Sequence, residues 1–219
     1  PSWQVILAPR GMLKASALKL KWLKKKVYLS LLKQLGVHKR VHWQATNEEE
    51  REDIFQQFGK KVRVSSAPNL PKQKQDPWQS VPKSQGKARL VYHSRLAPVK
   101  NLHFLLPLLR EVKGELTLSI YGPEKDAEYL EKCQRLAAGL PSRVRVDFLG
   151  PVSPIAMTEK LAPHHFSILP TMGENFGHSI FEGLLAGKPV IISDRTPWKH
   201  LKEKEIGWDC SLEKPEAFV

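Results

Sequence analysis

The feature that most constrains the fold is a regular alternation of short β-branched runs with helical patterns beyond residue 88. The runs with strand character are 90–93, 116–121, 144–149, 166–169 and 190–193. Helical patterns lie between and after them, near 101–112, 125–138, 154–162, 178–186 and 197–203. Such alternation is typical of βαβ units in a parallel sheet with helices on both faces. The sequence therefore predicts an α/β fold with a Rossmann-like parallel sheet, whose ligands bind beyond the carboxyl ends of the strands.

The earlier residues carry a shorter series of the same kind, followed by a change in composition. Strand character is found at 3–8, 41–45 and 62–67, a long helical pattern at 13–35, and a helix start with three glutamates after Thr46 or Asn47. From 68 to 87 the chain is rich in Pro, Gln, Lys and Ser without periodicity, which is typical of a linker. We expect a partial amino-terminal α/β region over 1–70, a linker over 71–88 and a second domain over 89–219.

The net charge of +13 is concentrated in the first part of the chain. Residues 1–84 contain 17 Lys and Arg against 6 Asp and Glu. A basic region of this kind suits nucleic acid, an anionic membrane surface or a phosphorylated ligand. Its aromatic residues lack the spacing of a base-stacking platform, which argues against nucleic acid: Trp3, Trp22, Tyr28 and Trp43.

The helical pattern at 13–35 has two apolar stripes on opposite sides. The broad stripe, predicted to face the core, consists of Leu13, Ala17, Leu20, Leu23, Val27, Leu31 and Leu35. The narrow stripe contains Leu18, Trp22 and Leu29 with lysines on both sides, a layout that suits a helix lying on an anionic membrane. Packing of the narrow stripe against another part of the domain is the alternative.

Cysteine content and hydropathy indicate in which cellular compartment the protein is expected. Cys133 and Cys210 are the only cysteines and lie 77 positions apart, which excludes a disulfide scaffold and a four-cysteine zinc site. No run approaches the roughly 20 apolar residues of a spanning helix. We expect a cytoplasmic protein. The absence of a leader, and a helical pattern that is cut at the last residues, predict that the sequence is a fragment.

The loop at 170–178 is the most informative for function. A glycine-containing loop that opens a helix presents N–H groups and the positive end of the helix dipole, which suits phosphate or sugar oxygens. Glu174 lies in the loop and Glu182 about one turn into the helix. A carboxylate accepts through two oxygens, so Glu182 could take both hydroxyls of a ribose while Glu174 faces another polar group. Spacing alone favours the alternative, in which Glu174 is an ordinary loop charge and Glu182 an ordinary helix acid.

Two segments resemble a known family. Residues 169–178 read LPTMGENFGH and continue into SIFEGLLAGKPVIISD, so that seven residues separate Glu174 from Glu182. This pattern resembles the E-x7-E signature of the group 1 (family 4) glycosyltransferases of GT-B fold, with Asn175 where the family commonly has Gly. Residues 93–100, HSRLAPVK, resemble the family's first carboxyl-terminal βα loop, in which an Arg and a Lys five apart bind the donor diphosphate.

The resemblance implies a retaining enzyme that moves a sugar from a UDP- or GDP-linked donor to a glycan or lipid-linked acceptor, in polysaccharide or lipopolysaccharide biosynthesis. It implies that Arg95 and Lys100 hold the diphosphate and that Glu182 holds the ribose. Glu174 is the catalytic candidate, in contact with the donor sugar near its reacting carbon. Val152 follows the strand whose loop meets the base. The remaining donor oxygens fall to the backbone amides of Asn175, Phe176, Gly177 and His178.

Residues 8–13, APRGML, resemble a segment of the family's amino-terminal domain and place Arg10 and Gly11 on the acceptor side. Members with His at the position of Arg10 present it towards the two sugars, so the resemblance leaves the role of Arg10 open. The family's glycine-rich loop and terminal crossing helix have no counterpart in the 219 residues. We therefore expect an inactive fragment, and a nucleotide-sugar-binding module without catalysis is the alternative.

No metal or other cofactor is expected. The sequence has no Asp-x-Asp pair, and Arg95, Lys100 and helix-end amides could stabilise the leaving group instead of a divalent ion. The nearest approaches to a metal cluster are His38 with His42 and His164 with His165, for which we expect surface or packing roles.

Overall fold

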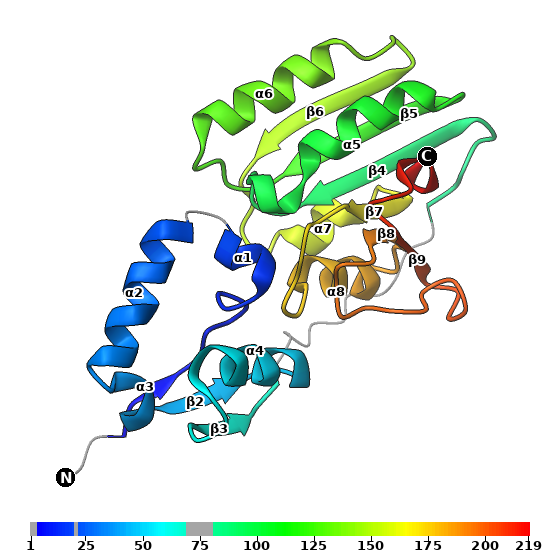
Figure 1. Cartoon of the computed structure of the whole chain (residues 1–219). Coiled ribbons are helices and arrows are strands. Elements are labelled where there is room, and N and C mark those ends of the chain that lie inside the picture. The colour runs from blue at the N-terminus through cyan, green and yellow to red at the C-terminus, as the bar shows by residue number, and fades with distance from the viewer. Residues whose placement is uncertain (1–3, 20–21, 69–80) are drawn as a thin grey trace. The chain divides into compact units, whose positions relative to one another are not determined.

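The structure is a computed structural model and describes residues 4–19, 22–68 and 81–219. It contains two compact units, Pro1–Leu70 with Glu174–Phe176, and Pro71–Gly173 with Gly177–Val219. Each unit has its own parallel sheet (Figure 1). Most of the predicted linker lies outside the described residues.

The first unit has a three-stranded parallel sheet in the order β1-β2-β3. Its strands are β1 (Ile6–Leu7), β2 (His42–Ala45) and β3 (Arg63–Ser66), and its helices are α1 (Ala15–Lys19), α2 (Trp22–Gln34), α3 (Val37–Arg40) and α4 (Glu48–Phe58). Trp43 and Ile54 are fully buried between β2 and α4. The side chain of Asn47 accepts a hydrogen bond from the backbone N–H of Glu50, which confirms the predicted start of α4.

Within the helix predicted over 13–35 the structure describes α1 and α2, and the assignment of the apolar faces is wrong for α2. Leu23, Val27 and Leu31 of the predicted core stripe are 50–60% exposed. Leu29 of the opposite stripe packs instead against the core around Trp43. Periodicity identifies two stripes but does not decide which one meets the sheet. Leu20 lies outside the described residues.

The second unit has a six-stranded parallel sheet in the order β6-β5-β4-β7-β8-β9. Its strands are β4 (Lys87–His93), β5 (Glu115–Tyr121), β6 (Val144–Gly150), β7 (Phe166–Leu169), β8 (Val190–Ser193) and β9 (Gly207–Cys210). Its α-helices are α5 (Leu102–Leu108), α6 (Ala127–Ala138), α7 (Met157–Leu161) and α8 (His178–Leu185). Short 3₁₀ segments occupy η1 (Pro98–Lys100), η2 (Leu109–Glu111) and η3 (Pro215–Phe218). The predicted α/β fold with a Rossmann-like parallel sheet is confirmed.

The region after β8 differs from the sequence prediction. Instead of a helix at 197–203 the chain forms turns and then β9. The carboxylate of Asp209 accepts hydrogen bonds from the backbone N–H groups of His200 and Leu201, and His200 has a positive φ of 59°, which is incompatible with a helix. Gly207 allows β9 to pair with β8, since any Cβ at this position would lie 2.0 Å from the carbonyl oxygen of Val190.

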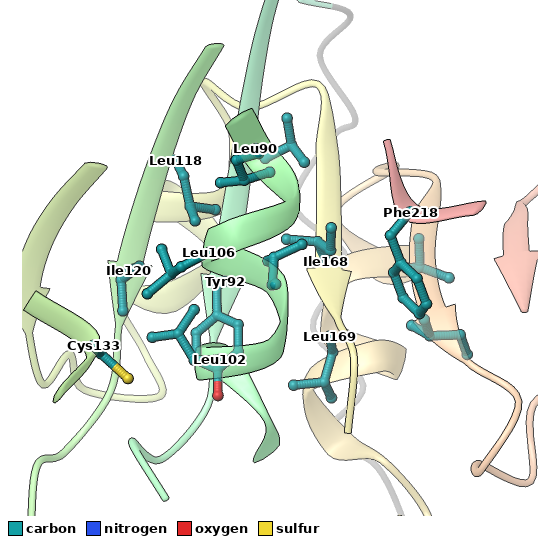
Figure 2. Packing of buried hydrophobic residues seen from close by; sticks show 14 of the residues in the cluster. Leu90, Tyr92, Leu102, Leu106, Leu118, Ile120, Cys133, Ile168, Leu169 and Phe218 are labelled. Atoms are coloured by element: carbon teal, nitrogen blue, oxygen red, sulfur yellow. The ribbon is translucent and has the colours of Figure 1, made fainter. Parts of the chain in front are cut away.

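β4 is buried on both faces of the sheet because it lies near its centre. Leu90 and Tyr92 pack with Leu106 of α5 and with neighbouring strands, as Figure 2 shows. Val91 faces the other side and packs with Leu161 of α7. Each fully buried side chain of this size contributes roughly 1.5–3 kcal/mol. The carboxyl end of β4 is therefore a fixed platform for the loop that follows it.

Candidate functional site

The order of the strands creates a topological switch point in the second unit. From β4 the chain continues to β5 and β6 on one side of the sheet, and then crosses to β7, β8 and β9 on the other. Ligands of open parallel sheets bind at the carboxyl ends of the two strands where the order reverses. Here these are β4, followed by loop 94–100, and β7, followed by loop 170–177. Both loops were selected from the sequence.

The two loops are fixed to each other by hydrogen bonds. The hydroxyl of Thr171 donates to the carbonyl oxygen of Val99 at 3.1 Å, and the backbone N–H of Met172 donates to the same oxygen at 2.8 Å. The hydroxyl of Ser193 donates to the carbonyl oxygen of Thr171. Lys100, the next residue after Val99 and half-buried, is therefore held beside loop 170–177.

The backbone around Arg95 is held equally firmly. The N–H of Leu96 donates to the carbonyl oxygen of Pro123 at 3.1 Å. Gly122 lies so close to Ser94 that a Cβ would meet its carbonyl oxygen at 1.9 Å, so only glycine fits there. The side chain of Arg95 is exposed. An exposed guanidinium on a fixed backbone is suited to an anionic ligand.

The amino end of α8 opens at the same end of the sheet. Gly177 caps the helix with a positive φ of 82°, and a Cβ there would lie 2.8 Å from Ile180 and 3.3 Å from the indole nitrogen of Trp198. Glycine is therefore required by both the backbone conformation and the space. The first N–H groups of a helix have no intrahelical acceptor and carry a partial positive charge. The first turn, which begins at His178, contains no acidic residue.

Glu182 follows one turn later and faces a buried histidine that sequence analysis missed. Its Oε2 lies 3.6 Å from Nε2 of His93, the last residue of β4. Burial lowers the pKa of His93 to about 4, with a smaller lowering by His164 and an opposing effect of the Ser179 backbone. His93 is therefore neutral near pH 7. The motif at 93–100 includes His93 but assigned roles only to Arg95 and Lys100, because the contact of His93 with Glu182 depends on the packing of α8 against β7.

Five predicted site residues belong to the first unit: Glu174, Asn175, Phe176, Arg10 and Gly11. This unit comprises Pro1–Leu70 together with Glu174–Phe176. Within it, Glu174 is buried, and its carbonyl oxygen accepts a hydrogen bond from Nζ of Lys14 at 2.6 Å. The side-chain amide of Asn175 donates to the hydroxyl of Thr46 at 2.5 Å. Phe176 is half-buried.

A buried carboxylate holds the Arg10–Gly11 turn. Glu50 is 1% exposed and accepts hydrogen bonds from the N–H of Gly11 at 2.6 Å and from the N–H and hydroxyl of Thr46 at 2.8 and 2.7 Å. Arg10 is exposed and has a positive φ of 49°. Sequence analysis missed Glu50, although Asn47 with Glu50 three residues later is similar to a capping box.

Val152 lies at the end of the sheet where β6 finishes. It is half-buried and packs against Val91, Tyr121 and Leu161. A cavity of about 450 Å³ lies at the opposite end of the sheet, at the amino ends of β4 and β5. Its lining includes several cations, Lys87, Arg89, Arg143 and Arg145.

Comparison with known families decides the membership of the chain. Residues 73–219, more than half of the chain, match the family described as glycosyl transferases group 1. The chain belongs to this family. No curated protein matches the sequence.

Solved structures resemble this group 1 glycosyltransferase chain over most of its length. HepE of Anabaena, solved with UDP and glucose, has 16% identity and a TM-score of 0.69 over 98% of this chain and 59% of its own. Sucrose-phosphate synthase of Thermosynechococcus elongatus has 15% identity and a TM-score of 0.75 over 99% of this chain and 57% of its own. TarM of S. aureus has 19% identity and a TM-score of 0.60 over 80% and 34%.

These structural similarities establish the GT-B fold. They establish nothing further, because the sequence identities are below 25%. The group 1 glycosyltransferase chain spans 59% of the length of HepE and 57% of the length of the synthase. The catalytic and donor-binding roles of individual residues are therefore proposals.

The histidines considered as metal ligands have other contacts in this group 1 glycosyltransferase chain. Nε2 of His42 lies 2.7 Å from the hydroxyl of Ser65, and Nδ1 of His165 accepts from the N–H of Arg89 at 3.1 Å. Among residues 4–19, 22–68 and 81–219, no three His, Cys, Asp or Glu side chains are grouped to hold a metal ion. Within the same residues, no helix is both long and apolar enough to cross a membrane.

Proposed function

We propose that this chain is the donor-binding part of a retaining glycosyltransferase, which moves a sugar from a nucleotide diphosphate sugar to a glycan or lipid-linked acceptor. The observation that carries the proposal is the gathering of two cations and a helix amino end at the switch point of the second unit. Arg95 and Lys100 follow β4, and α8 begins at His178 after β7. A diphosphate is the ligand whose charge these groups match best.

The proposed roles divide the donor into its parts. Arg95 and Lys100 bind the diphosphate, Glu182 accepts from the ribose hydroxyls, and Val152 with the end of β6 meets the base. The backbone amides of Asn175, Phe176, Gly177 and His178 meet the remaining oxygens of the phosphate and sugar. UDP is the nucleotide to test first, because HepE was solved with UDP and with UDP-glucose.

In the transfer step the bond between the sugar carbon and the diphosphate oxygen breaks, and a bond from the acceptor oxygen to the same carbon forms. The proton of the acceptor hydroxyl passes to the departing diphosphate oxygen. The diphosphate leaves with the negative charge, which Arg95, Lys100 and the amino end of α8 stabilise. This arrangement supplies positive charge without a metal ion. Glu174 is placed next to the reacting carbon in this proposal, with front-face attack retaining the configuration. The acceptor side is assigned to Arg10 and Gly11.

For the 219-residue chain itself we propose donor binding without turnover. The groups assigned in the second unit bind the donor, whereas transfer also needs an acceptor held in position with water excluded. On the acceptor side only the turn at Arg10 and Gly11 has been assigned. The alternative is a module that binds nucleotide sugar and has no catalytic counterpart.

Isothermal titration calorimetry on the full chain tests donor binding. UDP and UDP-glucose are expected to bind in buffer with EDTA, and Arg95→Ala is expected to weaken both. Lys132→Ala on α6, an exposed cation away from the switch point, is the matched control. Absence of UDP binding by the wild-type chain, or binding only with Mg²⁺, would contradict the proposal.

We also propose that α2 contacts an anionic membrane from the cytoplasmic side. The observation that favours it is the exposure of Trp22 and Tyr28 at 59% and 60%, next to the exposed apolar side chains of Leu23 and Val27. Lys24 and Lys26 are exposed beside them, and Nζ of Lys26 lies 5.6 Å from the centre of the Trp22 ring. Aromatic and apolar side chains bordered by lysines match the interface of an anionic bilayer.

A groove next to this surface suits the same partner. It has a volume of about 580 Å³ and lies between α1, α2 and Gln57 of α4. Its walls combine Leu18 and Leu29 with Lys19 and Lys33. A lipid with an acyl chain and an anionic head group satisfies both kinds of wall.

Vesicle sedimentation tests the membrane contact. The full chain is expected to sediment with vesicles that contain one third phosphatidylglycerol and not with pure phosphatidylcholine. The double variant Lys24→Glu/Lys26→Glu should lose this binding, whereas Lys132→Glu on α6 should keep it. Equal sedimentation with both vesicle types would contradict a role for the lysines.

A further inference from the structure

His93 is a buried titratable group that the proposed reaction does not use. It ends the central strand β4 and is 4% exposed. Its Nδ1 lies 3.5 Å from the hydroxyl oxygen of Ser167 on β7, and its Nε2 lies 3.6 Å from Oε2 of Glu182 on α8. Among residues 4–19, 22–68 and 81–219 its Nε2 has no partner within hydrogen-bond distance, and the backbone of Ser179 is a further polar group near the ring. A buried polar atom without a partner, aimed at a proposed ligand-binding carboxylate, calls for an explanation.

The two neighbours define which ring nitrogen carries the hydrogen. A carboxylate only accepts, so Nε2 carries the hydrogen where it faces Glu182. The hydroxyl of Ser167 can donate, so Nδ1 is the accepting nitrogen. The neutral ring has one donor and one acceptor and satisfies both neighbours at once. At 3.6 Å the pair lies just beyond ordinary hydrogen-bond distance.

The packing of α8 brings these groups together. Gly183, the residue after Glu182, lies so close to β7 that a Cβ would meet the Cβ of Ser167 at 3.0 Å. The glycine lets the helix approach the sheet beside His93. The histidine is fixed by the core around β4, whereas the Glu182 side chain is 44% exposed and has several rotatable bonds. The fixed partner can therefore restrict the mobile one.

We propose that His93 is a positioning residue, whose Nε2–H orients the Glu182 carboxylate towards the ribose of the donor. The assignment rests on the proposed function, in which Glu182 binds the ribose. A carboxylate has about four acceptor positions, so one hydrogen bond from His93 leaves both oxygens able to accept from ribose hydroxyls. Fixing the side chain beforehand lowers the entropy lost when the ligand binds.

Two substitutions distinguish the effect of losing the Nε2–H donor from the effect of losing the ring. Gln places an amide N–H near the position of Nε2, whereas Asn places its amide near Nδ1. His93→Asn is expected to lower the affinity of the full chain for UDP about tenfold, which corresponds to ~1.4 kcal/mol. His93→Gln should restore the affinity to within about threefold of the wild type, since it keeps the N–H. His165→Asn, a buried position just before β7 and therefore at the opposite, amino ends of the strands, is the matched control.

Inorganic pyrophosphate distinguishes positioning from a general structural effect, because it has no ribose. His93→Asn should leave pyrophosphate affinity unchanged, and in a Glu182→Ala background it should cause no further loss of UDP affinity. Equal losses for UDP and pyrophosphate, or additive losses in the double variant, would overturn the positioning role while leaving the diphosphate site intact. Failure of wild-type protein to bind either ligand would overturn the proposed function, and the positioning role with it.

Nitrogen-15 NMR of the wild-type histidine ring needs no variant. It therefore tests the proposal even if the His93 variants fail to fold. His93 is expected to be neutral at pH 7 with its hydrogen on Nε2. Addition of UDP should shift the Nε2 resonance, since the ribose hydroxyls then donate to the same carboxylate that accepts from Nε2. A hydrogen on Nδ1, or an Nε2 resonance that UDP does not move, would overturn the proposal.

Discussion

Acidification is expected to destabilise the second unit through His93. The ordinary pKa of a histidine is 6.5, and burial lowers the pKa of His93 to about 4. Between these values the unfolded chain binds a proton that the folded chain excludes. The free energy of unfolding therefore falls as the pH falls through this window. The stabilising contribution of the neutral His93 ring is complete above pH 6.5. A difference from 6.5 to about 4 corresponds to ~3 kcal/mol.

Urea unfolding followed by circular dichroism measures this effect. Wild type and His93→Gln are compared at pH 7.5 and pH 4.5. Other histidines with lowered pKa values, His103, His164 and His165, destabilise both proteins on acidification. The wild type should nevertheless lose about 2–3 kcal/mol more than the variant, because only it has the titrating ring at position 93. Equal losses in the two proteins would refute the reasoning.

Three further predictions follow from the site. Arg95→Ala should lower UDP affinity by about 1.5–3 kcal/mol, the range for a hydrogen bond to a charged group, as measured by calorimetry against Lys132→Ala. Glu182→Ala should weaken both UDP and UDP-glucose, whereas Glu174→Ala should weaken only UDP-glucose; equal losses would show that the two roles are wrongly divided. Glu50→Gln should destabilise the first unit by about 2 kcal/mol, because its amide hydrogens would face the donors of Gly11 and Thr46; urea unfolding compares it with Glu52→Gln, an exposed position on the same helix.

Much of the second unit could be predicted from the sequence because its strands are local patterns. The run Val190–Ser193 is β-branched and apolar, as a strand buried on both faces must be. β9 could not be predicted in this way. Its sequence, Gly-Trp-Asp-Cys, has no strand pattern, and it joins the sheet because Gly207 fits against Val190.

In the candidate site, too, the features set by local sequence patterns could be predicted and those set by tertiary packing could not. The loops at Arg95 and Gly177 could be chosen from the sequence, because the ends of parallel strands and the start of a helix mark ligand sites in any sheet of this kind. Glu50 and His93 could not be identified as site residues from the sequence. Glu50 acts on a turn far earlier in the chain, and His93 acts through a helix that the fold brings to it. The inward face of α2 was likewise decided by packing.

The central claim is that a nucleoside diphosphate binds at the carboxyl ends of β4 and β7. Backbone NMR of the full chain, titrated with UDP in the presence of EDTA, tests it most directly. We expect shifts at residues 94–100 and 177–182 and none at the cationic cavity around Arg89 and Arg143. Shifts confined to that opposite cavity, or no shifts at all, would contradict it.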